Sequence, residues 1–105
     1  MRILFDQGTP VPLRHALSVH TVDTAFEMGW SNFENGDLLA AAESQFDAFI
    51  TTDQNLQYQQ NLAGRRLAIL VLPFANWPKL RCHIPIIINA VDALKPGAFV
   101  NLVLD

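Results

Sequence analysis

Three aspartates stand beside short apolar segments, where parallel β-strands can bring carboxylates together. Asp6 follows the apolar run 3–5, and Asp53 follows the apolar run 48–50 after two threonines. Asp37 opens a segment of strong helix formers that leads into the second of these runs. Carboxylates that converge without a lysine or arginine repel one another, and a hard divalent cation relieves that repulsion. A cation such as Mg²⁺ or Mn²⁺ lowers the pKa of a bound water and polarises a phosphodiester, so these residues predict the chemistry of a metal-dependent nuclease.

Each of these aspartates also has a purely structural interpretation. Asp6 can initiate a turn, and Asp37 can complement the dipole of a helix near its N-terminus. Asp53 can cap a helix that begins at Gln54. For Asp37 taken alone, the structural interpretation is the preferred one. The prediction of a metal site therefore depends on the three carboxylates lying together.

The elements that must position these residues belong to one domain. The chain has 105 residues, half of them hydrophobic and 16% charged, which suits one packed core and a single domain over residues 1–105. Short apolar runs bounded by turn residues predict strands at 3–5, 21–22, 46–51, 67–72 and 99–104. The helices are expected at 12–17, at 37–43 with Asn35 as the N-cap, at 54–61 closed by Gly64, and from Asn76 or Trp77 to about Leu94 with Pro85 as a kink or a boundary.

This alternation of strands and helices is typical of an α/β fold, with a mostly parallel sheet sandwiched between helices. Such sheets place their sites at the carboxyl ends of the strands, in the crevice where the strand order reverses. Asp6 and Asp53 follow strands directly. Asp37 lies in the first turn of a helix, a position that can face the same end of the sheet.

The composition narrows the class of protein further. Ten acidic against seven basic residues give a formal net charge of −3, which argues against a wholly basic nucleic-acid surface but leaves a local patch open. The single cysteine, Cys82, excludes a disulfide framework and a multi-cysteine zinc site and favours a reducing cytoplasm. The chain shows neither a signal peptide nor an apolar run of about 18 residues, so we expect no membrane partner. A homodimer is expected from the general frequency of dimers alone.

Three segments of the sequence stand out together: Ile3-Leu4-Phe5-Asp6, Gly36-Asp37-Leu38-Leu39 and Ile50-Thr51-Thr52-Asp53-Gln54-Asn55-Leu56. They resemble the PIN-like domains of small bacterial proteins related to the VapC-type toxins of toxin–antitoxin loci. The resemblance covers the chain from Met1 to about Leu72. It implies a three-layer α/β/α sandwich, a ribonuclease activity that depends on Mg²⁺ or Mn²⁺, RNA as the substrate and an antitoxin protein as a partner. It also implies that Asp6, Asp37 and Asp53 are the catalytic residues and hold the metal.

The sequence departs from the family pattern at two supporting positions. Gln7 stands where a glutamate is common, and Asn55 stands where a second aspartate is common. Both amides still offer carbonyl oxygens to a hard cation, but each lost carboxylate removes a charge and weakens metal binding. Thr51 completes the supporting set, because its hydroxyl can orient a phosphate or a metal-bound water. The departures leave an alternative open: a catalytically degenerate PIN-like module that binds a protein or an RNA.

Two further interpretations remain: one concerns Trp30 and Phe33, and the other a different role for Asp53. Trp30 and Phe33 lie in a glycine-bearing loop and can stack a base, although core packing or a dimer contact is the commoner role of such residues. Asp53 could also accept a phosphoryl group, as in signalling receiver domains. Receiver domains need an acidic pair after the first strand and a lysine after the last, whereas this chain has Asp6 alone and Pro73-Phe74.

Overall fold

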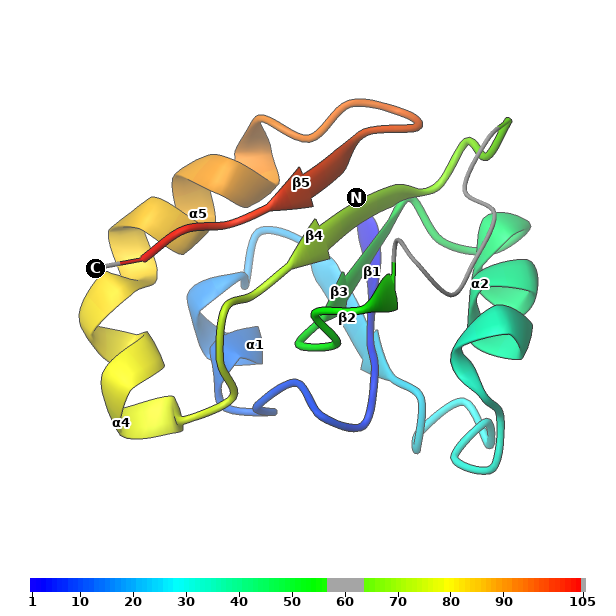
Figure 1. The fold of residues 1–105 in the computed structure, drawn as a ribbon, viewed down its shortest axis with the longest axis horizontal. Helices are drawn as coiled ribbons and strands as arrows, with labels where there is room; N and C mark the ends of the chain where they lie inside the picture. The colour runs from blue at the N-terminus through cyan, green and yellow to red at the C-terminus, as the bar shows by residue number, and fades with distance from the viewer. Residues whose placement is uncertain (57–63, 105) are drawn as a thin grey trace.

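Five short strands form one parallel sheet in the computed structural model of the chain, which describes residues 1–56 and 64–104 (Figure 1). The strands are β1 (Arg2–Phe5), β2 (Thr21–Thr24), β3 (Ala48–Thr51), β4 (Ala68–Val71) and β5 (Phe99–Asn101). They lie in the order β2-β1-β3-β4-β5, and every neighbouring pair is parallel. All residues of β3 and β4 are buried, as expected for strands covered on both faces.

Helices cover both faces of this sheet. Those in the described residues are α1 (Leu13–Ala16), α2 (Asn35–Glu43), α4 (Trp77–Leu80), the 3₁₀ helix η1 (Arg81–His83) and α5 (Ile84–Asp92). Figure 1 shows α1, α4 and α5 together on one side and α2 on the other. The predicted fold class, an α/β fold with a parallel sheet between two helical layers, is confirmed.

The alternation of side chains along each strand produces two separate hydrophobic cores. In β1, Ile3 and Phe5 point into the core formed with α1, α4 and α5, while Leu4 points into the core formed with α2. The first core also holds Leu13, Leu80, Ile87 and Val91, and the second holds Leu38, Leu39, Ala42 and Phe49. The residues that follow the strands lie beyond both cores, at the carboxyl ends of the strands, where polar side chains can gather.

Several predicted boundaries were wrong. Helix α2 begins at Asn35 and has Glu34 as its N-cap, because the Asn35 side chain is used elsewhere, in a hydrogen bond to Asp53. The single long helix expected after Asn76 is divided into α4, η1 and α5. Pro85 lies in the first turn of α5, where its missing N–H costs nothing, so it acts as a boundary rather than a kink.

Other boundary predictions were closer. Asn76 caps α4, since its side-chain oxygen accepts a hydrogen bond of 3.1 Å from the Lys79 N–H. The last strand lies at the edge of the sheet as expected, but it is regular only from Phe99 to Asn101. Most of the helix predicted at 54–61 falls outside the residues that the structure describes.

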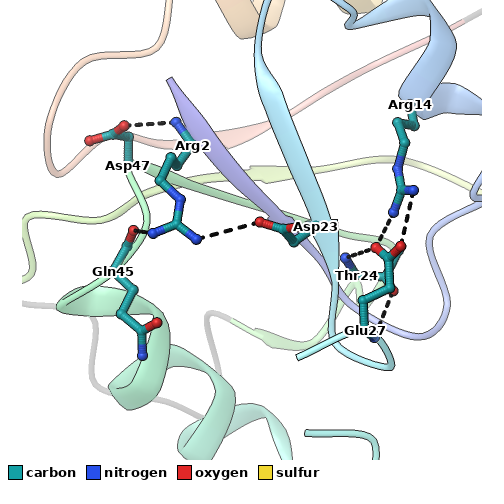
Figure 2. Close-up of polar contacts among 7 residues, drawn as sticks. All are labelled: Arg2, Arg14, Asp23, Thr24, Glu27, Gln45 and Asp47. Atoms are coloured by element: carbon teal, nitrogen blue, oxygen red, sulfur yellow. Dashed lines mark hydrogen bonds and ion pairs between the residues drawn. The ribbon is translucent and has the colours of Figure 1, made fainter. Parts of the chain in front are cut away.

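Arg2 fastens the amino end of β1 to its two neighbouring strands (Figure 2). Its backbone N–H donates to Asp47 Oδ2 at 2.8 Å, and its guanidinium donates to the Gln45 carbonyl at 3.1 Å. The same guanidinium lies 3.5 Å from Asp23 Oδ2. Asp23 is therefore paired with the Arg2 guanidinium, and Asp47 accepts a hydrogen bond from the Arg2 backbone.

Glu43 joins the C-terminus of α2 to the start of β4. Its two carboxylate oxygens accept hydrogen bonds from the backbone N–H groups of Arg66 at 2.6 Å and Leu67 at 2.9 Å. Burial by itself raises the pKa of Glu43, but these hydrogen bonds outweigh it and leave the pKa below its ordinary value of 4.5. The ionised side chain is thus a clasp between the two elements.

We expect Glu43→Gln to lower the free energy of unfolding by about 1–2 kcal/mol at neutral pH, because the amide can accept only one of the two hydrogen bonds well. Since the folded pKa is the lower one, ionised Glu43 stabilises the fold above its ordinary pKa, and this contribution is lost as the pH falls through the folded value. Urea unfolding at pH 7 and pH 3 measures both effects. Glu34→Gln is the control, because Glu34 makes no side-chain capping bond. An equal difference between wild type and Glu43→Gln at both pH values would contradict a role for the charge.

Candidate functional site

The site lies where the strand order reverses. The chain passes from β1 to β2 on one side of β1 and then returns as β3 on its other side. The chain that follows β1 leads to Leu13 in one core and the chain that follows β3 leads to Leu56 in the other, so the two loops run to opposite faces of the sheet. The residues that follow β1 and β3 begin with Asp6 and Thr52, and Thr51 is the last residue of β3.

Asp6 is buried at this point, with only 9% of its surface exposed. Its Oδ1 accepts hydrogen bonds from the backbone N–H of Thr9 at 3.0 Å and from the Thr9 hydroxyl at 2.6 Å. Its Oδ2 accepts a hydrogen bond from the Thr51 hydroxyl at 2.5 Å. All three donors are neutral, and no ion pair within residues 1–56 and 64–104 includes Asp6. Asp6 is therefore a buried carboxylate with no cation beside it in the described chain.

Thr51 connects Asp6 to Asp53. The Thr51 side chain is completely buried. Its oxygen accepts a hydrogen bond of 3.0 Å from the Asp53 N–H, and its O–H donates a hydrogen bond to Asp6. Asp53 is half-buried. Its Oδ2 accepts a hydrogen bond of 2.5 Å from the Asn35 amide, and its Oδ1 accepts one of 3.0 Å from the Asn55 N–H. The same hydroxyl group thus contacts the Asp6 carboxylate and the Asp53 backbone N–H.

The other predicted site residues lie around this pair. Asp37 is exposed in the first turn of α2, and its side chain makes no hydrogen bond or ion pair within the described residues. The Gln7 side-chain amide donates to the Ser31 carbonyl. Asn55 is exposed and reaches Asp53 through its backbone. In residues 1–56 and 64–104, no three His, Cys, Asp or Glu side chains are grouped so as to hold a metal ion.

The turn after Asp6 lies close against the end of β3. A Cβ built on Gly8 would stand 2.9 Å from the Thr52 hydroxyl oxygen and 3.8 Å from Asp6 Oδ1. Any residue larger than glycine at this position would have to displace the Thr52 side chain. The close approach keeps the loops after β1 and β3 in contact next to the carboxylate.

Sequence reasoning missed two neighbours of the site. Thr9 was not singled out, although the turn residues Asp6-Gln7-Gly8-Thr9 are the signal for a side chain that bonds back to the turn. Asn35 was expected to cap α2, and its contact with Asp53 could not be read from the sequence because the two residues are 18 positions apart.

A third missed feature is the reciprocal pair of Thr24 and Glu27 at the carboxyl end of β2 (Figure 2). The Thr24 N–H donates to Glu27 Oε1 at 2.9 Å, and the Glu27 N–H donates to the Thr24 hydroxyl at 3.1 Å. The Thr-x-x-Glu spacing is the sequence signal for this arrangement. Hydrogen bonds from Arg14 and then from the Thr24 N–H lower the pKa of Glu27. Glu27 thus has a cation partner, in contrast to Asp6.

Comparison with known proteins identifies no relative. No family model matches the chain, and neither a curated protein nor a solved structure matches it. The fold and the site together define an α/β protein with a parallel sheet and a buried carboxylate bonded to a threonine hydroxyl at its switch point. None of the helices in the described part of the chain is long and apolar enough to cross a membrane.

Proposed function

We propose that this protein is a metal-dependent ribonuclease of the PIN-like type, acting at the carboxyl ends of β1 and β3. The observation that carries the proposal is the burial of Asp6 with no cation beside it in the described chain. Buried charges in proteins are paired with an opposite charge or bind a metal ion. The three neutral donors around Asp6 orient its carboxylate but do not offset its charge.

The donor atoms at the site suit a hard cation. Mg²⁺ prefers oxygen ligands and is commonly held by one or two carboxylates together with substrate phosphates. Asp6 and Asp53 supply two carboxylates, and Asp6 has lone-pair capacity beyond its three hydrogen bonds. We propose Asp37 as a third acid and Gln7, Thr51 and Asn55 as the supporting residues. When bound, Mg²⁺ or Mn²⁺ would supply Lewis-acid activation of a phosphodiester.

This chain's own residues would then position the reacting groups. Thr9 and Thr51 fix the two oxygens of Asp6, and Asn35 and the Asn55 N–H fix those of Asp53. Such orientation of acidic ligands by neighbouring donors is as important to a metal site as the ligands themselves. The proposal includes RNA as the substrate, a cytoplasmic location, an antitoxin protein as a partner and assembly as a homodimer.

The direct test is cleavage of RNA by the purified full chain. We expect a labelled single-stranded RNA to be cut in Mn²⁺ or Mg²⁺ and to remain intact in EDTA. Titration calorimetry with Mn²⁺ alone, without RNA, measures metal binding separately. An RNA that stays intact in both metals, together with no heat of Mn²⁺ binding, would overturn the proposal.

The second candidate is a binding module with the same fold that does not cleave RNA. The described chain contains no group of three potential acidic or other metal ligands, and the oxygens of both Asp6 and Asp53 already accept hydrogen bonds from the protein. Gln7 is also occupied, because its amide donates to the Ser31 carbonyl. These observations favour a degenerate module that binds a protein or an RNA without cutting it.

Restoring the two missing carboxylates separates the two candidates. If the site is degenerate, Gln7→Glu with Asn55→Asp should create Mn²⁺ binding that wild type lacks, because two charges are added next to Asp6 and Asp53. If the site is active, wild type should bind Mn²⁺ already, and the double variant should tighten the Kd about tenfold or more. Calorimetry measures both Kd values.

Two controls accompany this double variant. Gln45→Glu with Asn89→Asp adds the same charge on exposed residues away from the switch point. Gln7→Met removes only the hydrogen bond to Ser31, which a glutamate cannot make either. Equal gains in Mn²⁺ affinity from the two double variants would mean that the added charge acts nonspecifically and that positions 7 and 55 do not belong to a metal site.

A further inference from the structure

The loop that precedes α2 is fastened at two points to the residues of the proposed site. The Gln7 side chain, next to Asp6, donates to the Ser31 carbonyl. The Asn35 amide, at the other end of the loop, donates to Asp53 Oδ2 at 2.5 Å. We call residues 30–34 the aromatic loop. Its two ends are thereby tied to the carboxyl ends of β1 and β3.

Two rings in the aromatic loop form a fixed stack. Trp30 and Phe33 have ring centroids 5.8 Å apart and nearly parallel planes, at 8°. Trp30 is anchored in the core, where its ring meets Phe46 edge-on at 6.2 Å. The Phe33 N–H also donates to the Trp30 carbonyl at 3.0 Å. Phe33 is therefore held in one orientation by an indole that is itself packed.

The Phe33 ring remains accessible and close to the acids. Although Trp30 stacks on it, 40% of the Phe33 surface is exposed. Phe33 is two residues from Ser31 and two from Asn35, so its Cα lies within about 7 Å of each of theirs. Because Ser31 touches Gln7 and Asn35 touches Asp53, the segment that carries this exposed ring is joined to the site on both sides.

We propose that Phe33 is the stacking platform for an unpaired base of the RNA whose phosphodiester lies at Asp6 and Asp53. This inference rests on the proposed function, since it assigns the substrate class of the same site. A preordered ring suits a base because stacking requires a flat face and little further loss of side-chain freedom. Bases in a duplex are already stacked and paired, so the expected substrate is single-stranded RNA, with little preference for sequence.

The experiment measures binding without cleavage, by fluorescence anisotropy of a labelled eight-nucleotide RNA in EDTA. We expect Phe33→Leu to weaken binding of the single strand about 5- to 150-fold, the usual effect of losing one stacked base. Phe33→Trp keeps a flat ring and should keep the affinity. The same RNA annealed to its complement should bind weakly to wild type and to all variants.

Phe26→Leu is the matched control. Phe26 is also an exposed phenylalanine, in the turn after β2, but no ring stacks on it in the described residues. Its replacement should change the affinity by less than twofold. Circular dichroism checks that each variant is folded, and a Phe33→Leu chain that fails to fold leaves Phe33→Trp and a Phe33→His variant to carry the comparison.

Several outcomes would overturn the inference. Unchanged affinity of Phe33→Leu, equal losses from Phe33→Leu and Phe26→Leu, or no RNA binding by wild type would each do so. Loss of self-association in Phe33→Leu with unchanged RNA affinity would show a protein interface instead. RNA binding that depends on Phe33, without any cleavage in Mn²⁺, would support Phe33 as a stacking platform and overturn the proposed nuclease activity. Cleavage that Phe33→Leu leaves unchanged would support the nuclease activity and overturn the role of Phe33.

Discussion

Asp6→Asn is expected to reduce RNA cleavage in Mn²⁺ by at least about 10²-fold, with little change in the free energy of unfolding. Removing one group that acts electrostatically at a reacting centre usually costs 10²- to 10³-fold in rate. The fold should tolerate the change, because the remaining side-chain oxygen can still accept both hydrogen bonds from Thr9, and the new amide N–H can donate to the Thr51 oxygen where Oδ2 accepted from it. The substitution also removes a buried charge that has no cation beside it in the described chain.

The measurements are single-turnover cleavage of a labelled RNA and urea unfolding in EDTA. Asp23→Asn is the matched control: it is an aspartate of the same sheet, but Arg2 partners it on the far side of β1, and cleavage should be unaffected. The opposite pattern, a loss of 1.5–3 kcal/mol of stability with cleavage retained, is what a purely structural carboxylate predicts. That pattern would contradict a catalytic role for Asp6.

Thr51→Val is expected to weaken both metal binding and cleavage by about 10- to 100-fold, the usual effect of removing a group that orients a metal ligand. Valine keeps the shape of threonine and removes the hydroxyl. Asp6 Oδ2 then loses its donor, and the Asp53 N–H loses its acceptor. Because Thr51 is completely buried, the unmade hydrogen bonds should also cost about 1–3 kcal/mol of stability.

Two variants distinguish positioning from simple destabilisation. Thr51→Ser retains the hydroxyl and should restore the Mn²⁺ Kd measured by calorimetry. Thr24→Val removes another buried hydroxyl, at the carboxyl end of β2 and in register with Phe5, where it accepts a hydrogen bond from Glu27. Thr24→Val should lower stability to a similar extent and leave the Kd unchanged. If both valine variants weaken Mn²⁺ binding equally, Thr51 has no special role in orienting the acids.

Much of the fold was predictable because its signals are local. Apolar runs such as 48–50 and 67–72 bounded by turn residues predicted buried strands, and they are buried. The predicted start of a helix at Asn76 or Trp77 is confirmed for the same reason, since the Asn76 cap is a contact over three residues. The helix after Asn76 was predicted as one unit because its apolar positions continue past Pro85, whereas its division depends on how each part meets the sheet.

The candidate site was predictable only in its residue types. The sequence by itself determined that Asp6 follows one buried strand, that Thr51 and Asp53 mark the end of another, and that Asp37 lies in the first turn of a helix. The strand order, which places β3 directly beside β1, was decided by the tertiary structure. The hydrogen bond between Asp6 and Thr51 spans 45 positions, and that between Asn35 and Asp53 spans 18. Local propensities carry no information about such separations, because both contacts form only when the packing of two cores aligns the ends of the strands.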